Sequence, residues 1–247
     1  MPKRSKTVPQ KKLTDAQKRK LAYIPMVMEN ITPTTVTDMR TVQQAFKQMV
    51  NNVFTHGVGK RGDDLRNYTG ATLELLGELA IKLCCDTLEI TNYTIDAGYL
   101  QHPDYDDIRL DEHLWINGQL VLMQEDRAWV DKPFASMKYQ VAQDLFTLPY
   151  NKVNNISSEL IIPVLCYSYD VTDATFNTRD YQFKKTLDVE NISVYNRYGD
   201  YRIQFFNISG HRRDARGDYF ARGYSPEECD KYIHFIYTYL ENYIRSM

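Results

Sequence analysis

The pair Asn117-Gly118 is the feature of this sequence that most constrains its fold. It lies between two short apolar segments, HLWI (113–116) and QLVLMQ (119–124). Asn-Gly between apolar segments is the strongest short-range signal for a β-hairpin with a two-residue turn. Like charges across a strand pair repel each other, so acids at the open end of this hairpin require a neutralising partner. Four acids gather there: Asp111, Glu112, Glu125 and Asp126.

The expected register of the hairpin brings two of these acids together. Counting outward from the turn places Leu114 opposite Val121 and Asp111 opposite Gln124. Asp111 is then beside Glu125, at the same end of the hairpin. Converging carboxylates are the ligands that a hard divalent cation such as Mg²⁺ requires. The sequence therefore predicts a magnesium site at this end of the hairpin.

Arg127 follows Glu125 by two residues and is expected on the same side of the strand. An aspartate, a hairpin and an acid-x-base sequence at the end of the second strand resemble the core signature of the PD-(D/E)XK nuclease superfamily. This superfamily includes most type II restriction endonucleases. The resemblance covers roughly residues 62–170, and it includes the preceding helix, a following helix at 133–146 and a buried strand at 159–169.

The resemblance implies a mixed α/β fold, with a central mixed β-sheet flanked by helices in a restriction-endonuclease-like core. It also implies a Mg²⁺-dependent, sequence-specific endonuclease that cuts double-stranded DNA as a homodimer. By position, Asp111 and Glu125 are the metal ligands and Arg127 is a catalytic residue. Glu78 on the preceding helix, or Glu74 one turn earlier, completes the metal shell.

Two departures from the family pattern leave alternatives open. Arg127 stands where the motif has lysine, and arginine cannot deprotonate in a protein. Water activation then falls to the metal, or to Lys132 or Lys138 in its place. No proline precedes Asp111, whereas a literal Pro-Asp occurs at residues 103–104, so Asp107 competes with Asp111 as the metal ligand.

Arginines are concentrated in a long segment near the C-terminus, which we expect to bind DNA. Residues 209–224 form a loop of about sixteen residues, and loops this long are usually functional or disordered. Arginine forks pair with guanine edges or clamp phosphates. A weaker phosphate contact is expected in a glycine-bearing turn, at Lys60 and Arg61. The arginines of the loop are Arg212, Arg213, Arg216 and Arg222.

Hydrophobic periodicity predicts the remaining elements within one domain, residues 13–247, after a disordered basic arm at 1–12. Residues 1–20 hold eight Lys or Arg and one acid, although the whole chain has a net charge of −2. Helices are expected at 37–54, at about 63–85, at 133–146 and from a Ser225-Pro226 start to the C-terminus. Strands are expected at 87–95, 158–171 and 192–209, in addition to the hairpin.

Composition places the chain among intracellular proteins without a membrane span. No run of eighteen apolar residues occurs, and the four cysteines match no metal-ligand spacing, so we expect buried thiols in a reducing, cytoplasmic compartment. Two other functions remain open. One is a repair or recombination nuclease of the same superfamily that recognises DNA structure; the other is a catalytically inactive DNA-binding protein.

Overall fold

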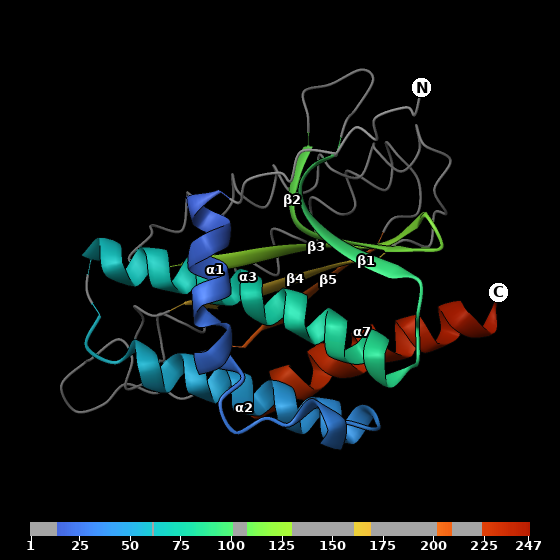
Figure 1. Cartoon of the computed structure of the whole chain (residues 1–247), viewed down its shortest axis with the longest axis horizontal. Helices are drawn as coiled ribbons and strands as arrows, with labels where there is room; N and C mark the ends of the chain where they lie inside the picture. The colour runs from blue at the N-terminus through green and yellow to red at the C-terminus, as the bar shows by residue number, and fades with distance from the viewer. Residues whose placement is uncertain (1–13, 61, 101–107, 130–160, 169–201, 209–223) are drawn as a thin grey trace, which may run out of the picture.

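A computed structural model describes residues 14–60, 62–100, 108–129, 161–168, 202–208 and 224–247, and shows a mixed α/β fold (Figure 1). The helical elements are α1 (Asp15–Val27), the short 3₁₀ helix η1 (Pro33–Thr35), α2 (Met39–Gly57), α3 (Gly62–Thr87) and α7 (Pro226–Arg245). The strands are β1 (Tyr93–Leu100), β2 (Ile108–Ile116), β3 (Gln119–Trp129), β4 (Ile161–Ser168) and β5 (Arg202–Asn207).

The five strands form one mixed sheet in the order β1-β2-β3-β4-β5. β1, β2 and β3 pair antiparallel, whereas β4 and β5 continue the sheet in parallel from β3. Helix α3 packs against β3 and α7 packs against β5, and α2 lies against both helices (Figure 1). The expected mixed α/β class and mixed sheet are therefore confirmed.

The predicted hairpin forms the junction between β2 and β3. Asn117 and Gly118 both have positive φ angles, 53° and 77°, as a type I′ turn requires. Glycine reaches this conformation without steric cost, and asparagine tolerates it better than most residues. The local sequence therefore determines the turn.

The predicted register of this hairpin is wrong by one residue beyond its first pairs. Leu114 pairs with Leu122 rather than with Val121, because a β-bulge interrupts the ladder after Trp115. An extra residue on one strand changes which side chains share a face from there on. As a result Glu112, and not Asp111, lies opposite Gln124.

Helices α2, α3 and α7 agree with the sequence prediction. Asp38 caps α2 in a reciprocal capping box, and Ser225 caps α7 by accepting a hydrogen bond from the Glu228 N–H. The buried face of α7 contains Tyr232, Ile236 and Leu240, each with no exposed surface. This helix therefore buries its apolar face in the core.

Helix α1 was not predicted. Its start is a second capping box, in which Thr14 and Gln17 exchange hydrogen bonds between side chain and backbone. This helix carries Lys20 toward the sheet and has Pro25 within its last turn.

The remaining strand predictions are met in part. β1 begins at residue 93, later than expected, while β4 lies within the predicted segment 158–171. β5 is one strand of the hairpin expected at 192–209. The arm at 1–12, the helix at 133–146 and the first strand of that second hairpin lie outside the described residues.

Glycine at position 77 lets α3 approach β3 closely. A Cβ atom built there would collide with the Gln124 amide nitrogen and would lie 2.6 Å from Oδ2 of Asp126. A Cβ at Gly70, on the same helix, would meet no atom within 4 Å. Close packing is thus found at Gly77 and not at Gly70.

This contrast gives a matched pair of substitutions. Gly77→Ala is expected to lower the free energy of unfolding by about 2 kcal/mol, because the methyl group must displace two buried polar side chains. Gly70→Ala is expected to leave it unchanged or to raise it by up to about 1 kcal/mol, because alanine favours the helix. Urea denaturation of both variants measures the difference; equal effects would contradict the close approach.

Two expectations from composition concern the membrane and the thiols. No helix in the described ranges is long and apolar enough to cross a membrane. Cys84, Cys85 and Cys229 are buried free thiols, and burial raises the pKa of Cys85 to about 12. These three thiols are therefore protonated and unreactive at neutral pH.

Candidate functional site

Two buried carboxyl groups on adjacent strands form the centre of the candidate site. Glu112 on β2 is 1% exposed and Asp126 on β3 is 7% exposed. Glu112 pairs with Gln124, and Asp126 follows two residues later, so all three belong to one face of the sheet. That face is the one that α3 approaches at Gly77.

Lys20 of α1 extends to this pair from outside the sheet. Its ammonium lies 3.6 Å from Oε1 of Glu112 and 2.7 Å from Oε2 of Glu78 on α3. The Lys20 side chain is 12% exposed, whereas that of Glu78 is 41% exposed. The cluster therefore runs from a buried end at Glu112 to a solvent-exposed end at Glu78.

The pKa values of the cluster favour a positively charged group, here the Lys20 ammonium, beside the carboxyl pair. Burial raises the pKa of Glu112 well above its ordinary value, and the neighbouring charge of Asp126 raises it further. Burial likewise raises the pKa of Asp126. Burial alone would lower the pKa of Lys20, but the charges of Glu112 and Glu78 outweigh burial and raise it. The lysine is therefore a permanent cation beside carboxyl groups that resist ionisation.

Several oxygens of the pair are left without hydrogen bonds. Both carboxyl oxygens of Glu112 and Oδ2 of Asp126 are buried and, apart from the hydrogen bond between the two carboxyl groups themselves, lack a hydrogen-bond partner among the described residues. Buried polar atoms are normally satisfied, so each exception requires an explanation. Carboxylate oxygens are the ligands that Mg²⁺ prefers. The donor chemistry of the pair therefore fits a hard divalent cation.

The described residues alone do not form a complete metal cage. Within them, no three Asp, Glu, His or Cys side chains converge as a metal-binding group. Mg²⁺ does not need such a cage, because it usually retains several waters and binds through one or two protein carboxylates together with substrate phosphates. Glu112 and Asp126 meet that smaller requirement.

The raised carboxyl pKa values predict a pH dependence of stability in metal-free protein. A carboxyl whose pKa is raised in the folded state stabilises the fold most below its unfolded pKa, near 4, and this contribution is lost as the pH rises through the folded pKa. Lys20 stays charged over this range and adds no slope. The slope is about 1.4 kcal/mol per pH unit for each titrating group.

The double variant Glu112→Gln/Asp126→Asn isolates this contribution. Relative to the double variant, the wild type is expected to lose stability progressively as the pH rises above about 4. Urea denaturation in a chelator at several pH values measures the difference. A difference that does not change with pH would contradict the raised pKa values.

The acids that the sequence predicted for the site differ in how they relate to the carboxyl pair. Asp111 on β2 is half-buried, and its Oδ2 accepts a hydrogen bond of 2.8 Å from the backbone N–H of Asp126. It therefore holds the β3 backbone at the carboxyl pair. Glu78 joins the cluster through Lys20. The backbones of Glu125 and Arg127 pair with β4, at Val164 and Cys166, and their side chains lie outside the description.

The other predicted residues do not join the described cluster. Lys60 lies 4.8 Å from the ring centroid of Tyr68, in a cation–π contact. The alternatives Lys132, Lys138 and Asp107 fall in parts of the chain that the structure does not describe. The same is true of Arg61, Arg212, Arg213, Arg216 and Arg222.

Three residues of the site were not predicted from the sequence to belong to it: Lys20, Gln124 and Tyr232. The Tyr232 hydroxyl donates to Oε1 of Gln124 at 2.7 Å, and Gln124 Nε2 donates to Oδ1 of Asp126 at 3.0 Å. A polar glutamine at the end of an apolar strand was a visible signal. The contacts with α1 and α7 were not visible, because they join segments far apart in the chain.

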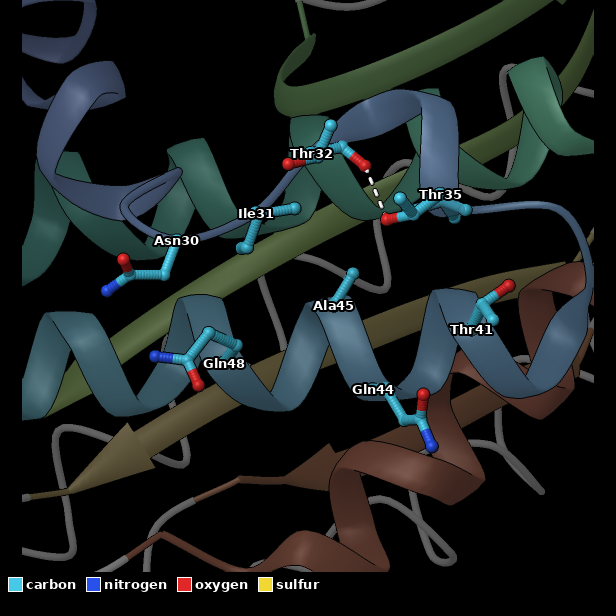
Figure 2. Close-up of a pocket in the computed structure, with 9 residues that line it drawn as sticks. Asn30, Ile31, Thr32, Thr35, Thr41, Gln44, Ala45 and Gln48 are labelled. Carbon is cyan, nitrogen blue, oxygen red and sulfur yellow. Dashed lines mark hydrogen bonds between the residues drawn. The ribbon is translucent and has the colours of Figure 1, made fainter.

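A separate pocket lies between α2 and the segment that follows α1. Its volume is about 210 Å³, and it is lined by uncharged side chains that include Thr35, Thr41, Gln44 and Gln48 (Figure 2). The Thr35 hydroxyl donates to the Thr32 carbonyl oxygen within it, at 2.8 Å. None of its lining residues belongs to β2, β3 or α3, so it is separate from the carboxyl cluster.

Comparisons of this chain with protein-family models, with curated proteins and with solved structures found no match. The site is therefore interpreted from its own residues. Its defining features are two buried carboxyl groups with open oxygens, a fixed ammonium from α1 and an exposed side at Glu78.

Proposed function

We propose that this chain is a Mg²⁺-dependent endonuclease that hydrolyses phosphodiester bonds of double-stranded DNA. One observation carries the proposal: Glu112 and Asp126, on adjacent strands, keep buried carboxyl oxygens that have no hydrogen-bond donor outside the pair itself in the described part of the chain. Burying such a pair is costly for folding, and the same burial raises the pKa of both groups. A cost of this kind is typical of sites that bind a ligand or catalyse a reaction.

The arrangement of strands supports the same proposal. A helix, α3, precedes an antiparallel three-strand unit, and the sheet then continues with parallel strands. This order is compatible with the restriction-endonuclease-like core that the resemblance to PD-(D/E)XK nucleases implies. The carboxyl groups stand on β2 and β3, the strands of the predicted hairpin.

In the proposed reaction, Glu112 and Asp126 hold the cation, and Lys20 contributes a second positive charge. A bound Mg²⁺ polarises the phosphoryl oxygen and lowers the pKa of its bound water. Lys20 remains protonated, so it balances the charge that develops on the phosphate and does not act as the base. Water activation then remains with the metal, or with Lys132 or Lys138 as the sequence allows.

The remaining expectations from the sequence, on the roles of individual residues, the DNA contacts and the homodimer, are part of the proposal. Glu112 and Asp126 take the metal-ligand roles that the resemblance assigned to Asp111 and Glu125, and Asp111 orients Asp126 through the backbone hydrogen bond. Base recognition is assigned to the arginines of 209–224, and phosphate contacts to the turn at residues 60–61. Cutting both strands of a symmetric sequence calls for a homodimer, because a two-fold protein matches a palindromic site.

Incubating supercoiled and linear plasmid with the purified chain tests the proposal. Discrete fragments with Mg²⁺, and none with a chelator, are the expected result. Cutting that depends on junctions or breaks would instead indicate a structure-specific nuclease. Intact DNA at every Mg²⁺ concentration would contradict nuclease function altogether.

One observation favours the second candidate, a catalytically inactive DNA-binding protein. Lys20 already provides positive charge to Glu112 and Glu78, so the cluster is neutralised in part without a metal. In that case plasmid would remain intact but migrate more slowly, and Mg²⁺ would not change the stability of the protein. The strand arrangement and the open Oδ2 of Asp126 lead us to prefer the enzyme.

A further inference from the structure

Three tyrosines of α7 donate hydrogen bonds to β3, and only one of them leads to the carboxyl pair. Tyr239 donates to the backbone oxygen of Val121 at 2.9 Å, and Tyr243 donates to the Gln119 side chain at 3.2 Å. Tyr232 donates to the Gln124 side chain at 2.7 Å. The three contacts belong to one helix and one strand, so they form a natural set for comparison.

The contact of Tyr232 continues to Asp126 through Gln124. The Gln124 amide nitrogen donates to Oδ1 of Asp126 at 3.0 Å. With a cation bound, Asp126 is ionised and can only accept, so the NH₂ group of the amide then faces Asp126 and its oxygen faces the tyrosine. The Tyr232 hydroxyl must then donate. The direction of the chain from α7 to Asp126 is therefore fixed by the chemistry of its groups.

This chain determines which oxygen of Asp126 is left open. Oδ1 accepts the amide hydrogen bond, whereas Oδ2 has no hydrogen-bond partner in the described residues. The side chains of Gln124 and Tyr232 have no exposed surface, so water does not replace either contact. Oδ2 also lies close to α3, because a Cβ atom built at Gly77 would be only 2.6 Å from it.

We propose that Tyr232 and Gln124 are positioning residues that orient Asp126 so that its Oδ2 faces the divalent cation held with Glu112. This inference rests on the proposed function, because it assigns a role toward that cation. Neither residue contacts the cation itself. Their role is to hold the carboxylate in one rotamer, as outer-shell partners commonly do for metal-ligating side chains.

The test compares Tyr232→Phe with the matched variants Tyr239→Phe and Tyr243→Phe. Each removes one hydroxyl that bridges α7 and β3. Tyr232→Phe is expected to weaken Mn²⁺ binding, measured from the free-ion signal in electron paramagnetic resonance, by about 10- to 100-fold. The Mg²⁺ concentration for half-maximal cleavage should rise by a similar factor. The two control variants should change both quantities less than about twofold, being remote from Asp126.

Gln124→Met provides a second, independent variant, because it keeps the volume and removes both hydrogen bonds. It should weaken Mn²⁺ binding as Tyr232→Phe does, and the double variant should be no weaker than the worse single one. Thermal unfolding of all variants in a chelator shows whether each is folded at the assay temperature. A purely structural tyrosine would lower thermal stability without changing cation affinity in the folded protein.

The outcomes separate this inference from the proposed function. If the wild type binds Mn²⁺ and cleaves DNA, but Tyr232→Phe matches Tyr239→Phe in cation affinity, the positioning role is overturned and the nuclease proposal stands. If the wild type neither binds Mn²⁺ nor cleaves, both are overturned. Selective weakening in Tyr232→Phe and Gln124→Met supports the inference.

Discussion

Asp126→Asn and Glu112→Gln are each expected to reduce Mg²⁺-dependent DNA cleavage by roughly 10³-fold or more, while the protein remains folded. Each substitution keeps the shape of the side chain and removes the charge that would hold the cation, and a metal ion at a phosphoryl centre stabilises the transition state by several kcal/mol. Single-turnover cleavage of a plasmid with saturating protein measures the effect on the chemical step.

Asp126→Asn is expected to stabilise the metal-free protein at neutral pH, whereas Glu112→Gln is expected to change its stability little. Burial disfavours the ionised form of both carboxyl groups, so an amide removes an unfavourable charge, but at position 112 it also removes a partner of the Lys20 ammonium. Loss of activity together with unchanged or higher stability is the pattern that distinguishes a functional site from a structural ion-pair network. Mg²⁺ should raise the melting temperature of the wild type and not that of Asp126→Asn.

Glu241→Gln is the matched control for these carboxyl variants. Glu241 forms an exposed ion pair with Arg245 on α7, at 2.9 Å, away from the carboxyl cluster. It should cleave DNA at the wild-type rate. Cleavage by Asp126→Asn or Glu112→Gln at a rate close to that of this control would remove the carboxyl pair from the mechanism.

Lys20→Met is expected to lower the free energy of unfolding by about 3 kcal/mol, because it leaves buried Glu112 without its nearest cation. Glu78 also loses its ion pair with Lys20, but it is 41% exposed, so water can solvate its charge and this second loss costs little stability. Urea denaturation at neutral pH without divalent cations measures the change. Cleavage should also fall, since the ammonium would no longer balance charge on the phosphate.

Two further variants show whether the Lys20 effect arises from this pair. Lys20→Met/Glu112→Gln should regain most of the lost stability, because no uncompensated buried charge remains. Lys231→Met should cost no more than about 1 kcal/mol, because Lys231 is exposed and, within the described ranges, its ion pairs are with Glu227 and Glu228 on its own helix. Additive effects of the two substitutions at the cluster would contradict a direct interaction.

Much of the fold follows from local patterns in the sequence. Asn117-Gly118 specified the turn, Ser225-Pro226 marked the start of α7, and periodic apolar residues located α2 and α3. Each of these signals lies within one element or at its end. Helix α1 was missed because apolar spacing is weak in a segment rich in lysine and arginine, although Thr14 and Gln17 formed a recognisable capping box.

The candidate site could be predicted only in part, because its geometry depends on a bulge and on distant contacts. Regular alternation from the turn placed Asp111 opposite Gln124, but the bulge places Glu112 there. A bulge depends on how the whole sheet twists and packs, so counting along the hairpin does not reveal it. The contacts of Lys20 and Tyr232 join α1 and α7 to the hairpin over long stretches of sequence, 108 residues in the case of Tyr232 and Gln124.

Cleavage of the polypeptide by a bound redox metal tests the central claim most directly. Fe²⁺ in place of Mg²⁺, with ascorbate and peroxide, generates radicals that cut the backbone next to the cation. The account predicts cuts in β2 around residue 112 and in β3 around residue 126, suppressed by excess Mg²⁺ and absent in Glu112→Gln/Asp126→Asn. Cuts elsewhere in the chain, or cuts that persist in the double variant, would contradict a cation site at this carboxyl pair.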